Sequence, residues 1–310
     1  MLNNYRKKIM QDDMTAKNCL VTGANSGIGR EIALGLAQSG ASVIMVCRDA
    51  DRGREALEDI RLKSGNKSLE LFLADLSSQH QVRRVAAAVK FKYEELHVLV
   101  NNAGVVMDKR LLTEDGIEMT FAVNYLAYFM LTNLLINLLM AGAPSRVVNI
   151  SSMAHRSAKL DFADLQGEKT YNRDTAYAQS KLADILFTYE LGRRLEGTGV
   201  TVNSVCPGGV ASRLWENSNP VINYFFKTFM KGPGQGARLP LYLASSPEVE
   251  GLSGKYFQTR EHLKFQHVKT QGAMCKTSPV SYDHVAARKL WEVSERLTGV
   301  SFPTDASAAV

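Results

Sequence analysis

Short apolar, β-rich runs alternate with amphipathic segments along most of this chain. Seven runs are expected to be strands, over residues 18–22, 42–47, 69–74, 98–101, 146–150, 201–206 and 255–257. The segments between them, near residues 27–39, 51–63, 79–93, 113–140, 174–196 and 234–245, have the periodicity of helices. Strict alternation predicts a doubly wound α/β fold, in which helices cover both faces of one sheet of about seven parallel strands. In such sheets ligands bind beyond the carboxyl ends of the strands.

The size and charge of the chain narrow the classes of protein. It has 310 residues, of which 45% are hydrophobic and 22% charged, values that are ordinary for a folded protein and exclude global disorder. One open α/β sheet can take up this length, so we expect a single domain over residues 1–310. The net charge is +6, but the basic residues are interleaved with acids and form no cluster with stacking aromatics. An anionic cofactor is therefore a simpler partner than nucleic acid.

The cysteines and histidines give no sign of a metal site. The six histidines lack a metal-ligand spacing, and the four cysteines form no Cys-x-x-Cys pair. Cys19, Cys47 and Cys206 fall in strand-like runs and, with Cys275, are expected to be reduced packing residues. The first residues, which include Arg6-Lys7-Lys8, lack the apolar stretch of a secretory signal. We therefore expect a cytoplasmic location.

Residues 121–143 contain no charged side chain and are numerous enough to cross a bilayer. Asn124, Asn133 and Asn137 would be costly in lipid, and the segment lies between two strands that need a crossover helix to pair in parallel. A core helix is therefore expected rather than a membrane span. Because this helix is apolar on several sides, we expect the sheet to cover one face and a second subunit the other, which predicts a homodimer.

A glycine-rich turn, Thr-Gly-Ala-Asn-Ser-Gly-Ile-Gly-Arg over residues 22–30, directly follows the first strand and opens a helix. Gly23 permits the tight turn, Gly27 allows a pyrophosphate to approach the backbone, and Gly29 lets helix and strand pack closely. The free amides of the helix would face the anion. In this context the pattern is typical of a Rossmann-type dinucleotide site.

Arg48 follows the second strand, where an NAD site usually has a carboxylate for the adenosine ribose. A guanidinium can bind a 2′-phosphate bidentately, whereas an acid would repel it. The sequence therefore predicts NADP(H) in preference to NAD(H). The alternative is a solvated surface charge, and the neighbouring Asp49 counts against phosphate binding.

Tyr177 and Lys181 are four residues apart, downstream of the pair Ser151-Ser152. Residues i and i+4 share one face of a helix, so the lysine ammonium can lie near the phenol and favour its ionised form. Lowering a phenol pKa from about 10 to about 7 needs roughly 4 kcal/mol, about what one cation some 4 Å away supplies at an effective dielectric of 20. This pattern also occurs by chance on many helices. Together with the glycine-rich turn and the serine pair upstream, however, it indicates nicotinamide-dependent hydride transfer.

The motif series resembles that of the short-chain dehydrogenase/reductase family over about residues 17–257. The residues that carry the likeness are 22–29, Asp75, 101–104, Ser152, Tyr177, Lys181 and Pro207-Gly208. The resemblance implies a catalytic tetrad of Asn124, Ser152, Tyr177 and Lys181. In the reductive direction Tyr177 would protonate the carbonyl oxygen and Ser152 would hydrogen-bond it. Lys181 would lower the phenol pKa and bind the nicotinamide ribose, and Asn124 would hold a water that links Lys181 to solvent.

Two of these roles have alternatives. Asn124 could serve ordinary capping or packing in an uncharged helix. Ser151 is the rival for the serine role, although the family motif places the catalytic hydroxyl at the second serine, Ser152.

The resemblance also implies a set of cofactor contacts. Asp75 would hold the adenine amino group, Asn102 and Gly104 would flank the adenosine ribose, and residues 207–210 would contact the nicotinamide side. The full expected set is Gly23, Asn25, Ser26, Gly27, Ile28, Gly29, Arg48, Asp75, Leu76, Asn102, Ala103, Gly104, Tyr177, Lys181, Pro207, Gly208 and Val210. By itself, the pair Asn101-Asn102 would indicate a turn or a helix cap.

Residues 164–169 and 290–294, and the wide spacing of Ser152 and Tyr177, resemble the retinol dehydrogenase-like branch of the family. That likeness implies an apolar aldehyde or ketone and its alcohol, such as a retinoid, and mostly NADP(H). The chain departs from the branch by showing no N-terminal membrane anchor, by having Cys206 where many members carry histidine, and by extra residues around 259–274.

Residues 210–232 lie where the family has its substrate lid, and residues 258–310 form an expected C-terminal extension. The lid segment is rich in apolar side chains, which fit an apolar substrate; the alternatives are simple core packing and peripheral contact with a membrane. The rival class of function is a regulatory protein that binds NADPH without turning it over. A complete tetrad disfavours that rival.

Overall fold

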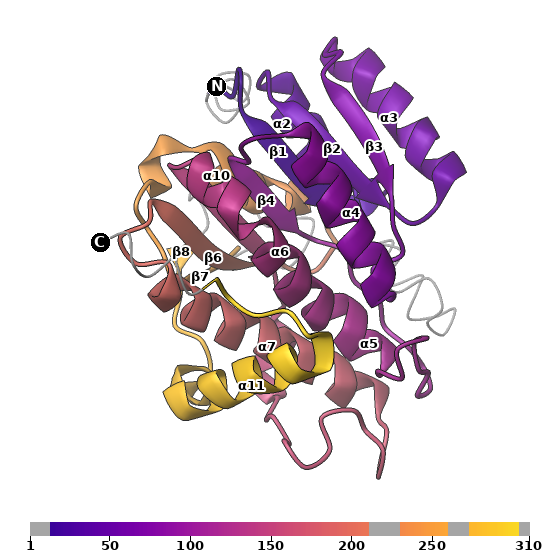
Figure 1. Ribbon diagram of the computed structural model, residues 1–310, viewed down its shortest axis with the longest axis vertical. Helices are drawn as coiled ribbons and strands as arrows, with labels where there is room; N and C mark the ends of the chain where they lie inside the picture. Colours follow the sequence, from indigo (N-terminus) through magenta and orange to yellow (C-terminus); the bar gives the residue numbers. More distant parts are fainter. Residues whose placement is uncertain (1–12, 211–229, 260–272, 304–310) are drawn as a thin grey trace.

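The computed structural model describes residues 13–210, 230–259 and 273–303, and one sheet runs through them (Figure 1). Its strands are β1 (Asn18–Thr22), β2 (Ser42–Cys47), β3 (Leu69–Leu73), β4 (Val98–Asn101), β5 (Ser145–Ile150), β6 (Val200–Cys206), β7 (Lys255–Gln258) and β8 (Ala273–Met274). Their order is β3-β2-β1-β4-β5-β6-β7-β8. The first seven pair in parallel, as predicted, whereas β8 pairs antiparallel with β7 and was not predicted.

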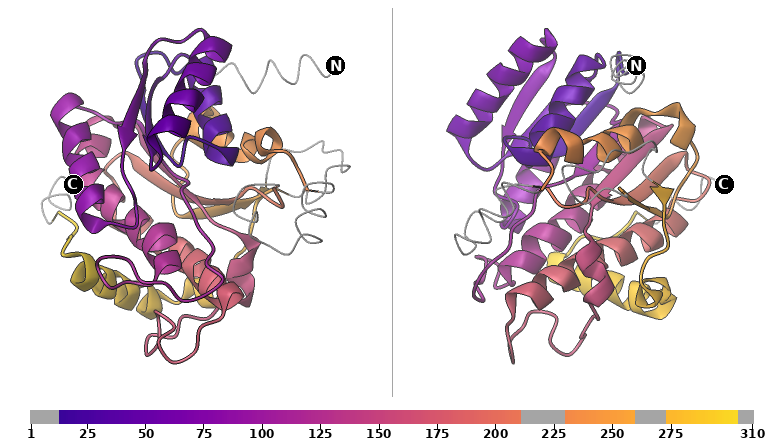
Figure 2. Two further views of the ribbon diagram at one scale, coloured as in Figure 1. Left: turned by 90° about the vertical axis from the view of Figure 1, so that its right-hand side faces the viewer. Right: turned by 180° about the vertical axis from the view of Figure 1, so that it is seen from behind.

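Helices cover both faces of this sheet, as the alternation predicted (Figure 2). One face carries α2 (Gly27–Gln38), α3 (Ala50–Ser64), α9 (Pro233–Gly236) and α10 (Arg238–Ser245). The other carries α4 (Gln79–Lys92), α5 (Met119–Phe121), the π-helix η1 (Ala122–Leu126), α6 (Ala127–Ala141) and α7 (Arg173–Arg194), with α11 (His284–Thr298) against α7. Three short 3-10 helices are η2 (Met153–Ser157), η4 (Pro247–Val249) and η5 (Pro279–Tyr282).

Alternation of side chains along the central strand produces two cores. In β1, Leu20 packs with the α4, α6 and α7 side, whereas Cys19 and Val21 pack with the α2, α3 and α10 side. Successive residues of a strand point to opposite faces, so a strand with helices on both faces must be apolar throughout. Cys19, Cys47 and Cys206 are buried, as expected of packing residues, Cys275 is half-buried, and none of the four forms a disulfide.

The chain crosses from one half of the sheet to the other between β3 and β4, and β1 and β4 are neighbours. The strand order reverses between β1 and β4, so the loops that follow these two strands run in opposite directions along the sheet. Ligands of doubly wound sheets bind in the crevice at such a point. The glycine-rich turn after β1 and the Asn-Asn-Ala-Gly segment after β4 both lie there.

One predicted boundary is wrong. A helix was expected from residue 113, but helical structure begins only at Met119. Gly116 has a φ of 73°, and Leu112 pairs with Glu118 in an antiparallel bridge, which closes a tight loop instead. The carboxylate of Glu118 then caps the helix by accepting hydrogen bonds from the amides of Thr120 and Phe121.

The helical segment Met119–Ala141 is long and apolar enough to cross a membrane, but 83% of its most apolar stretch is buried inside the protein. It is a core helix. Its outer side meets α11, where Trp291 packs edge-on against Phe129 with ring centres 5.0 Å apart. Cover by α11 thus replaces part of the cover that was expected from a second subunit, and the homodimer stays a prediction.

Several expectations fall outside the described residues. They concern most of the lid segment (211–229), most of the extra residues (260–272), the first twelve residues and the tail after residue 303. The helix α11, with an Asp283 cap and a left-handed Gly299 at its end, belongs to the expected C-terminal extension but was not among the predicted helices.

Candidate active site

The glycine-rich turn forms a cradle that leaves no room for side chains. Gly23 has a φ of 66° and Gly27 a φ of 57°, a region that favours glycine. A Cβ on Gly29 would lie 2.4 Å from the carbonyl oxygen of Gly23 and 2.4 Å from Nδ2 of Asn102. The turn can therefore approach both the strand ends and a ligand closely, as the sequence predicted.

The start of α2 offers free backbone amides to that cradle. Ser26 stands at the N-cap in extended conformation, and within the described chain its side chain makes no capping hydrogen bond. No acidic residue occupies the first turn of α2. Unsatisfied amides at a helix N-terminus bind anions, which fits the pyrophosphate of a dinucleotide.

Asn102 fastens the two strand ends together. Its backbone amide donates to Oγ1 of Thr22 at 2.8 Å, and its side-chain amide donates to the carbonyl oxygen of Thr22 at 2.8 Å. The amide of Ala103 donates to the same Thr22 hydroxyl at 3.0 Å. Asn102 thus shapes the floor of the cradle, whereas Asn101 is buried and bonds Thr132 and Asn149.

Arg48 and Asp75 meet at the carboxyl ends of β2 and β3. Their side chains are 4.0 Å apart, and that of Arg48 is 71% exposed. Asp49, which counted against phosphate binding, uses its carboxylate to cap α3 by accepting from the amides of Asp51 and Arg52. Asp49 is therefore engaged in the cap, while the guanidinium of Arg48 is exposed at this edge of the sheet.

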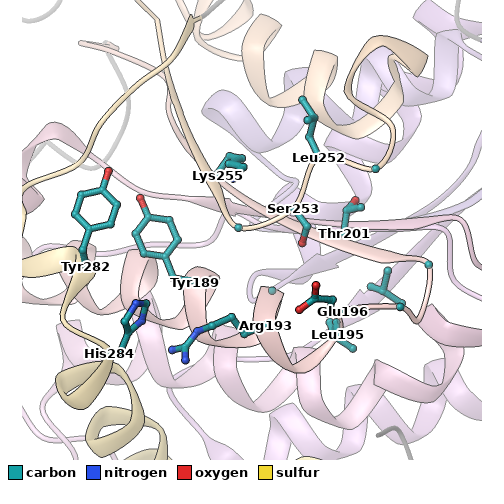
Figure 3. A pocket seen from close by; sticks show the side chains of 16 residues that line it. Tyr189, Arg193, Leu195, Glu196, Thr201, Leu252, Ser253, Lys255, Tyr282 and His284 are labelled. Atoms are coloured by element: carbon teal, nitrogen blue, oxygen red, sulfur yellow. The ribbon is translucent and has the colours of Figure 1, made fainter. Parts of the chain in front are cut away.

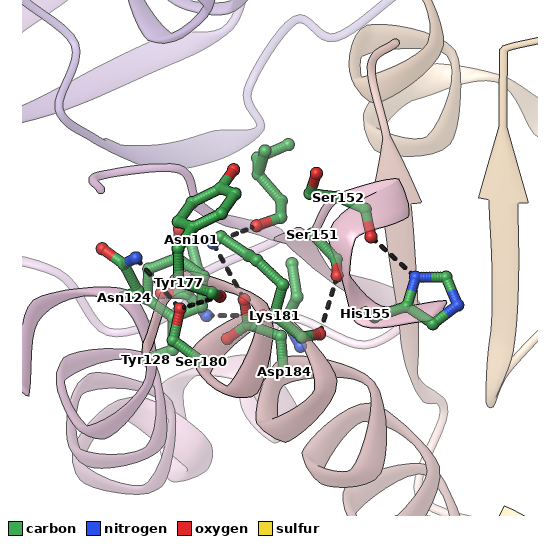
Figure 4. A network of polar contacts seen from close by, with 12 residues as sticks. Asn101, Asn124, Tyr128, Ser151, Ser152, His155, Tyr177, Ser180, Lys181 and Asp184 are labelled. Atoms are coloured by element: carbon green, nitrogen blue, oxygen red, sulfur yellow. Dashed lines mark hydrogen bonds and ion pairs between the residues drawn. The ribbon is translucent and has the colours of Figure 1, made fainter. Parts of the chain in front are cut away.

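Ser152 and Tyr177 come together although 25 positions separate them in the sequence (Figure 4). The Tyr177 phenol is hydrogen-bonded to Ser152, and the residue is half-buried. Ser151, the rival serine, donates its hydroxyl to the carbonyl oxygen of Lys181 at 2.9 Å and is itself buried. The structure therefore gives Ser151 a structural contact and leaves Ser152 beside the phenol. His155 is buried and bonded to the carbonyl oxygen of Ser152.

Lys181 lies close to Tyr177 but is held by other groups. Its Nζ donates to the carbonyl oxygen of Ile150 and to Oδ2 of Asp184, each at 2.9 Å. It is 5.9 Å from the centre of the Tyr177 ring and 5.4 Å from that of Tyr128. The pKa of the Tyr177 phenol is raised, not lowered as expected, because burial outweighs the hydrogen bond from Ser152. In this arrangement Asp184 engages the charge that was expected to act on the phenol.

Asn124 lies in the π-helix η1, a local widening of the helix that is frequent at functional sites. Its Oδ1 accepts from the amide of Val105 at 2.7 Å, and its Nδ2 donates to the carbonyl oxygen of Val105 at 3.0 Å and to Oγ of Ser180 at 3.1 Å. Both ends of the amide are thus used to join the loop after β4 to α7. The expected water relay stays a prediction.

The remaining expected contacts line the same edge. Leu76 is buried after β3, and Gly208 has a φ of 85° after β6. Val210 is buried and pairs with Lys231 in a parallel bridge. Residues 207–210 therefore lie at the carboxyl end of β6, next to the Ser152 strand.

Another cavity, of about 650 Å³, lies at the opposite edge of the sheet (Figure 3). Tyr189 and Arg193 of α7, Thr201 of β6 and Lys255 of β7 contribute to its lining. It shares no residue with the candidate site. Among the described residues, no group of three or more His, Cys, Asp or Glu side chains could hold a metal ion.

A dinucleotide cradle and a Ser–Tyr–Lys cluster at one edge of a doubly wound sheet define a nicotinamide-dependent oxidoreductase. The model of the short chain dehydrogenase family matches residues 17–222, and the chain belongs to that family. It is 42% identical to human retinol dehydrogenase 14 over 309 residues, which covers 93% of this chain and 88% of that protein. With human retinol dehydrogenase 11 the identity is 43%, covering 93% and 87%.

Solved structures show the same fold. A crystal structure of a protein from Mycobacterium paratuberculosis matches with a TM-score of 0.76 at 32% identity and covers 94% of this chain and 97% of that one. A short-chain dehydrogenase from Shigella flexneri, crystallised with NADP, matches with a TM-score of 0.64 at 25% identity, covering 80% and 98%. The protein is therefore a short-chain dehydrogenase that resembles retinol dehydrogenases and acts on alcohol and carbonyl groups.

Proposed function

We propose that this enzyme prefers NADP(H) and interconverts an apolar aldehyde or ketone, such as a retinoid, with the corresponding alcohol. The cofactor preference is supported by Arg48, whose exposed guanidinium stands at the end of β2 while Asp49 is engaged in a helix cap. The substrate class is supported by the likeness to retinol dehydrogenases 11 and 14.

The observation that carries the proposal is the contact between Ser152 and Tyr177 beside Lys181, at the same sheet edge as the glycine cradle. The nicotinamide, when bound, supplies or accepts the hydride. Tyr177 holds the proton that the substrate oxygen gains on reduction, because desolvation raises the pKa of its phenol and favours the protonated form. Ser152 donates a hydrogen bond to the same oxygen and stabilises the charge that develops there.

Other residues hold this arrangement in place. Lys181 is positioned by the Ile150 carbonyl and Asp184, and Asn124 ties the loop after β4 to the helix that carries Tyr177. The backbone amides at the start of α2 would bind the pyrophosphate, and Asn102 keeps the cradle open by anchoring Thr22. We keep the homodimer and the cytoplasmic location as predictions; sedimentation of the cofactor-bound protein tests the first.

Turnover by the purified protein tests this proposal. NADPH and NADH consumption is measured with retinal, medium-chain aldehydes and aromatic ketones, for the wild type and for Tyr177→Phe. The matched control is Tyr189→Phe. It also removes a tyrosine hydroxyl from α7, but this hydroxyl is bonded to Thr277 and not to Ser152. We expect NADPH-dependent reduction that Tyr177→Phe abolishes and Tyr189→Phe preserves. Equal activity in the Tyr177→Phe variant would refute the assigned proton donor.

A further inference from the structure

Asp184 is a buried acid one helical turn beyond Lys181, and the function proposed above uses it only to hold Lys181 in place. Its side chain is fully buried, and Oδ2 accepts a hydrogen bond from Nζ of Lys181 at 2.9 Å. Its other oxygen, Oδ1, is buried and has no hydrogen-bond partner among the residues that the structure describes. A half-satisfied buried carboxylate is costly, and such an ion pair is weak support for stability. Its place beside the catalytic lysine points to chemistry instead.

The charge of Asp184 opposes that of Lys181 at the reacting phenol. A positive charge near Tyr177 favours the phenolate, whereas a negative charge in the same low-dielectric region disfavours it. Burial is the largest cause of the raised pKa values of Tyr177, Tyr128 and Tyr125, and the carboxylate of Asp184 raises all three further. Because the ammonium is bound to this carboxylate, the pair presents little net charge to the phenol.

The other groups around the pair are neutral at moderate pH. Tyr128 and Tyr125, from α6 and η1, are buried phenols with raised pKa values, and Cys206, at the end of β6, is a buried thiol with a raised pKa. Tyr128 donates its hydroxyl to the carbonyl oxygen of Ala103 at 2.8 Å and so stays a fixed dipole. Among these groups, Asp184 is the carboxylate that opposes the charge of Lys181 at Tyr177.

We propose that Asp184 is a positioning residue of the reaction, which holds the Lys181 ammonium and offsets its charge, and so sets the pH range in which Tyr177 exchanges its proton. Burial raises the pKa of Asp184 to about 7, against the pull of Lys181. Above that pH the carboxylate is ionised and keeps Tyr177 protonated, which suits proton donation to a carbonyl. This inference rests on the proposed function, since it takes Tyr177 as the acid.

The test reads Tyr177 directly and needs no substrate. The near-ultraviolet absorbance of phenolate is titrated in the wild type and in Asp184→Asn, each compared with the same protein carrying Tyr177→Phe, so that the difference isolates Tyr177. In the wild type the Tyr177 signal is expected only near the alkaline limit of the folded protein. In Asp184→Asn its midpoint is expected about one to three pH units lower, because the lysine charge is then unopposed.

The matched control is Glu190→Gln. Glu190 is another buried carboxylate on α7, but it pairs with Arg193 and Arg194 instead of Lys181. We expect its Tyr177 midpoint to equal that of the wild type. Coincident titrations of wild type and Asp184→Asn, or an equal shift in Glu190→Gln, would overturn the inference.

A conservative variant and a kinetic readout complete the design. If Asp184→Asn does not fold, Asp184→Glu keeps the carboxylate and should keep the midpoint within about half a unit; a shift of about one unit or more contradicts the proposal. Where turnover is found, the pH at which reduction declines should fall with the same midpoint in Asp184→Asn. A shifted titration without turnover removes the proposed function alone, and turnover with an unshifted titration removes this inference alone.

Discussion

The substitution Gly29→Ala tests the glycine cradle most sharply, because the structure gives the size of the conflict. The added Cβ would lie 2.4 Å from the backbone oxygen of Gly23 and 2.4 Å from Nδ2 of Asn102. Contacts of that kind normally start near 3.4 Å, so the turn or the helix must move by about 1 Å. Since the Gly23 oxygen belongs to the backbone, a simple change of rotamer cannot relieve the overlap.

The cost follows from two terms. Overpacking of a well-packed site costs about 1–3 kcal/mol. Displacing Nδ2 of Asn102 also strains its 2.8 Å hydrogen bond to the Thr22 carbonyl, which is worth about 1 kcal/mol. Together we expect roughly 2–4 kcal/mol, which lowers the Tm of a chain of this length by roughly 3–6 °C. Because the amides of α2 move with the turn, affinity for NADPH should fall at least about tenfold.

Thermal unfolding with and without NADPH, together with calorimetric titration of NADPH, measures both effects. The control is Gly232→Ala: a Cβ at Gly232 meets no atom of the described residues within 4 Å, and the φ of Gly232 is −68°. That variant should bind NADPH as the wild type does. Unchanged NADPH affinity in Gly29→Ala would refute the assignment of this turn as the cofactor cradle.

Three further predictions concern the cofactor edge, the outer helix and the buried acid. Arg48→Ala should lower kcat/KM for NADPH roughly 10- to 100-fold and leave kcat/KM for NADH unchanged. The control Arg52→Ala should change neither value. An unaltered ratio of the two values in Arg48→Ala would contradict the phosphate role. Trp291→Ala should destabilise the protein by about 3–5 kcal/mol in chemical denaturation, against little for the exposed Val285→Ala, and a loss below about 1 kcal/mol would show that α11 does not close the core. Burial raises the pKa of Asp184 to about 7, so its protonated form contributes stability that is complete below about pH 4 and is lost as pH rises through about 7. Between these values the free energy of unfolding of Asp184→Asn should therefore rise by up to about 4 kcal/mol relative to wild type, and parallel stability curves would exclude this.

Local patterns predicted much of the fold and the cofactor edge. Each strand is a short apolar run, and the spacing of Gly23, Gly27 and Gly29 after β1 specifies a turn that few other sequences form. The helical spacing of Tyr177 and Lys181 was likewise visible in the chain. These features depend on residues that are close in the sequence, so they can be predicted from the sequence alone.

Contacts between distant segments were not accessible in the same way. The family motif favoured Ser152 over Ser151, but the physical reason appeared only in the structure, where Ser151 bonds the carbonyl oxygen of Lys181. The direction of the Tyr177 pKa was wrong because it depends on burial and on Asp184, whose side chain faces inward. The contact of Asp184 with Lys181 could have been predicted from their spacing, because an acid three residues after Lys181 lies on the same helical face.

The helix α11 also had a signal that could have been used. An acidic cap at Asp283, a glycine at Gly299, and apolar residues at helical spacing, including Leu290 and Trp291, mark its limits and its buried face. The core helix was predicted to start too early because hydrophobic periodicity locates a helix but not its first residue. Here Gly116 and the Glu118 cap fix that residue.

Transfer of deuterium from NADPH labelled at the reactive nicotinamide carbon tests the central claim most directly. Retinal or another aldehyde from the active panel is incubated with the enzyme and labelled NADPH, and the alcohol product is analysed by mass spectrometry. The account predicts one deuterium per product molecule at the former carbonyl carbon, and no product with Tyr177→Phe. Tight NADPH binding with no labelled alcohol from any carbonyl compound would contradict hydride transfer and would favour a protein that binds NADPH without turning it over.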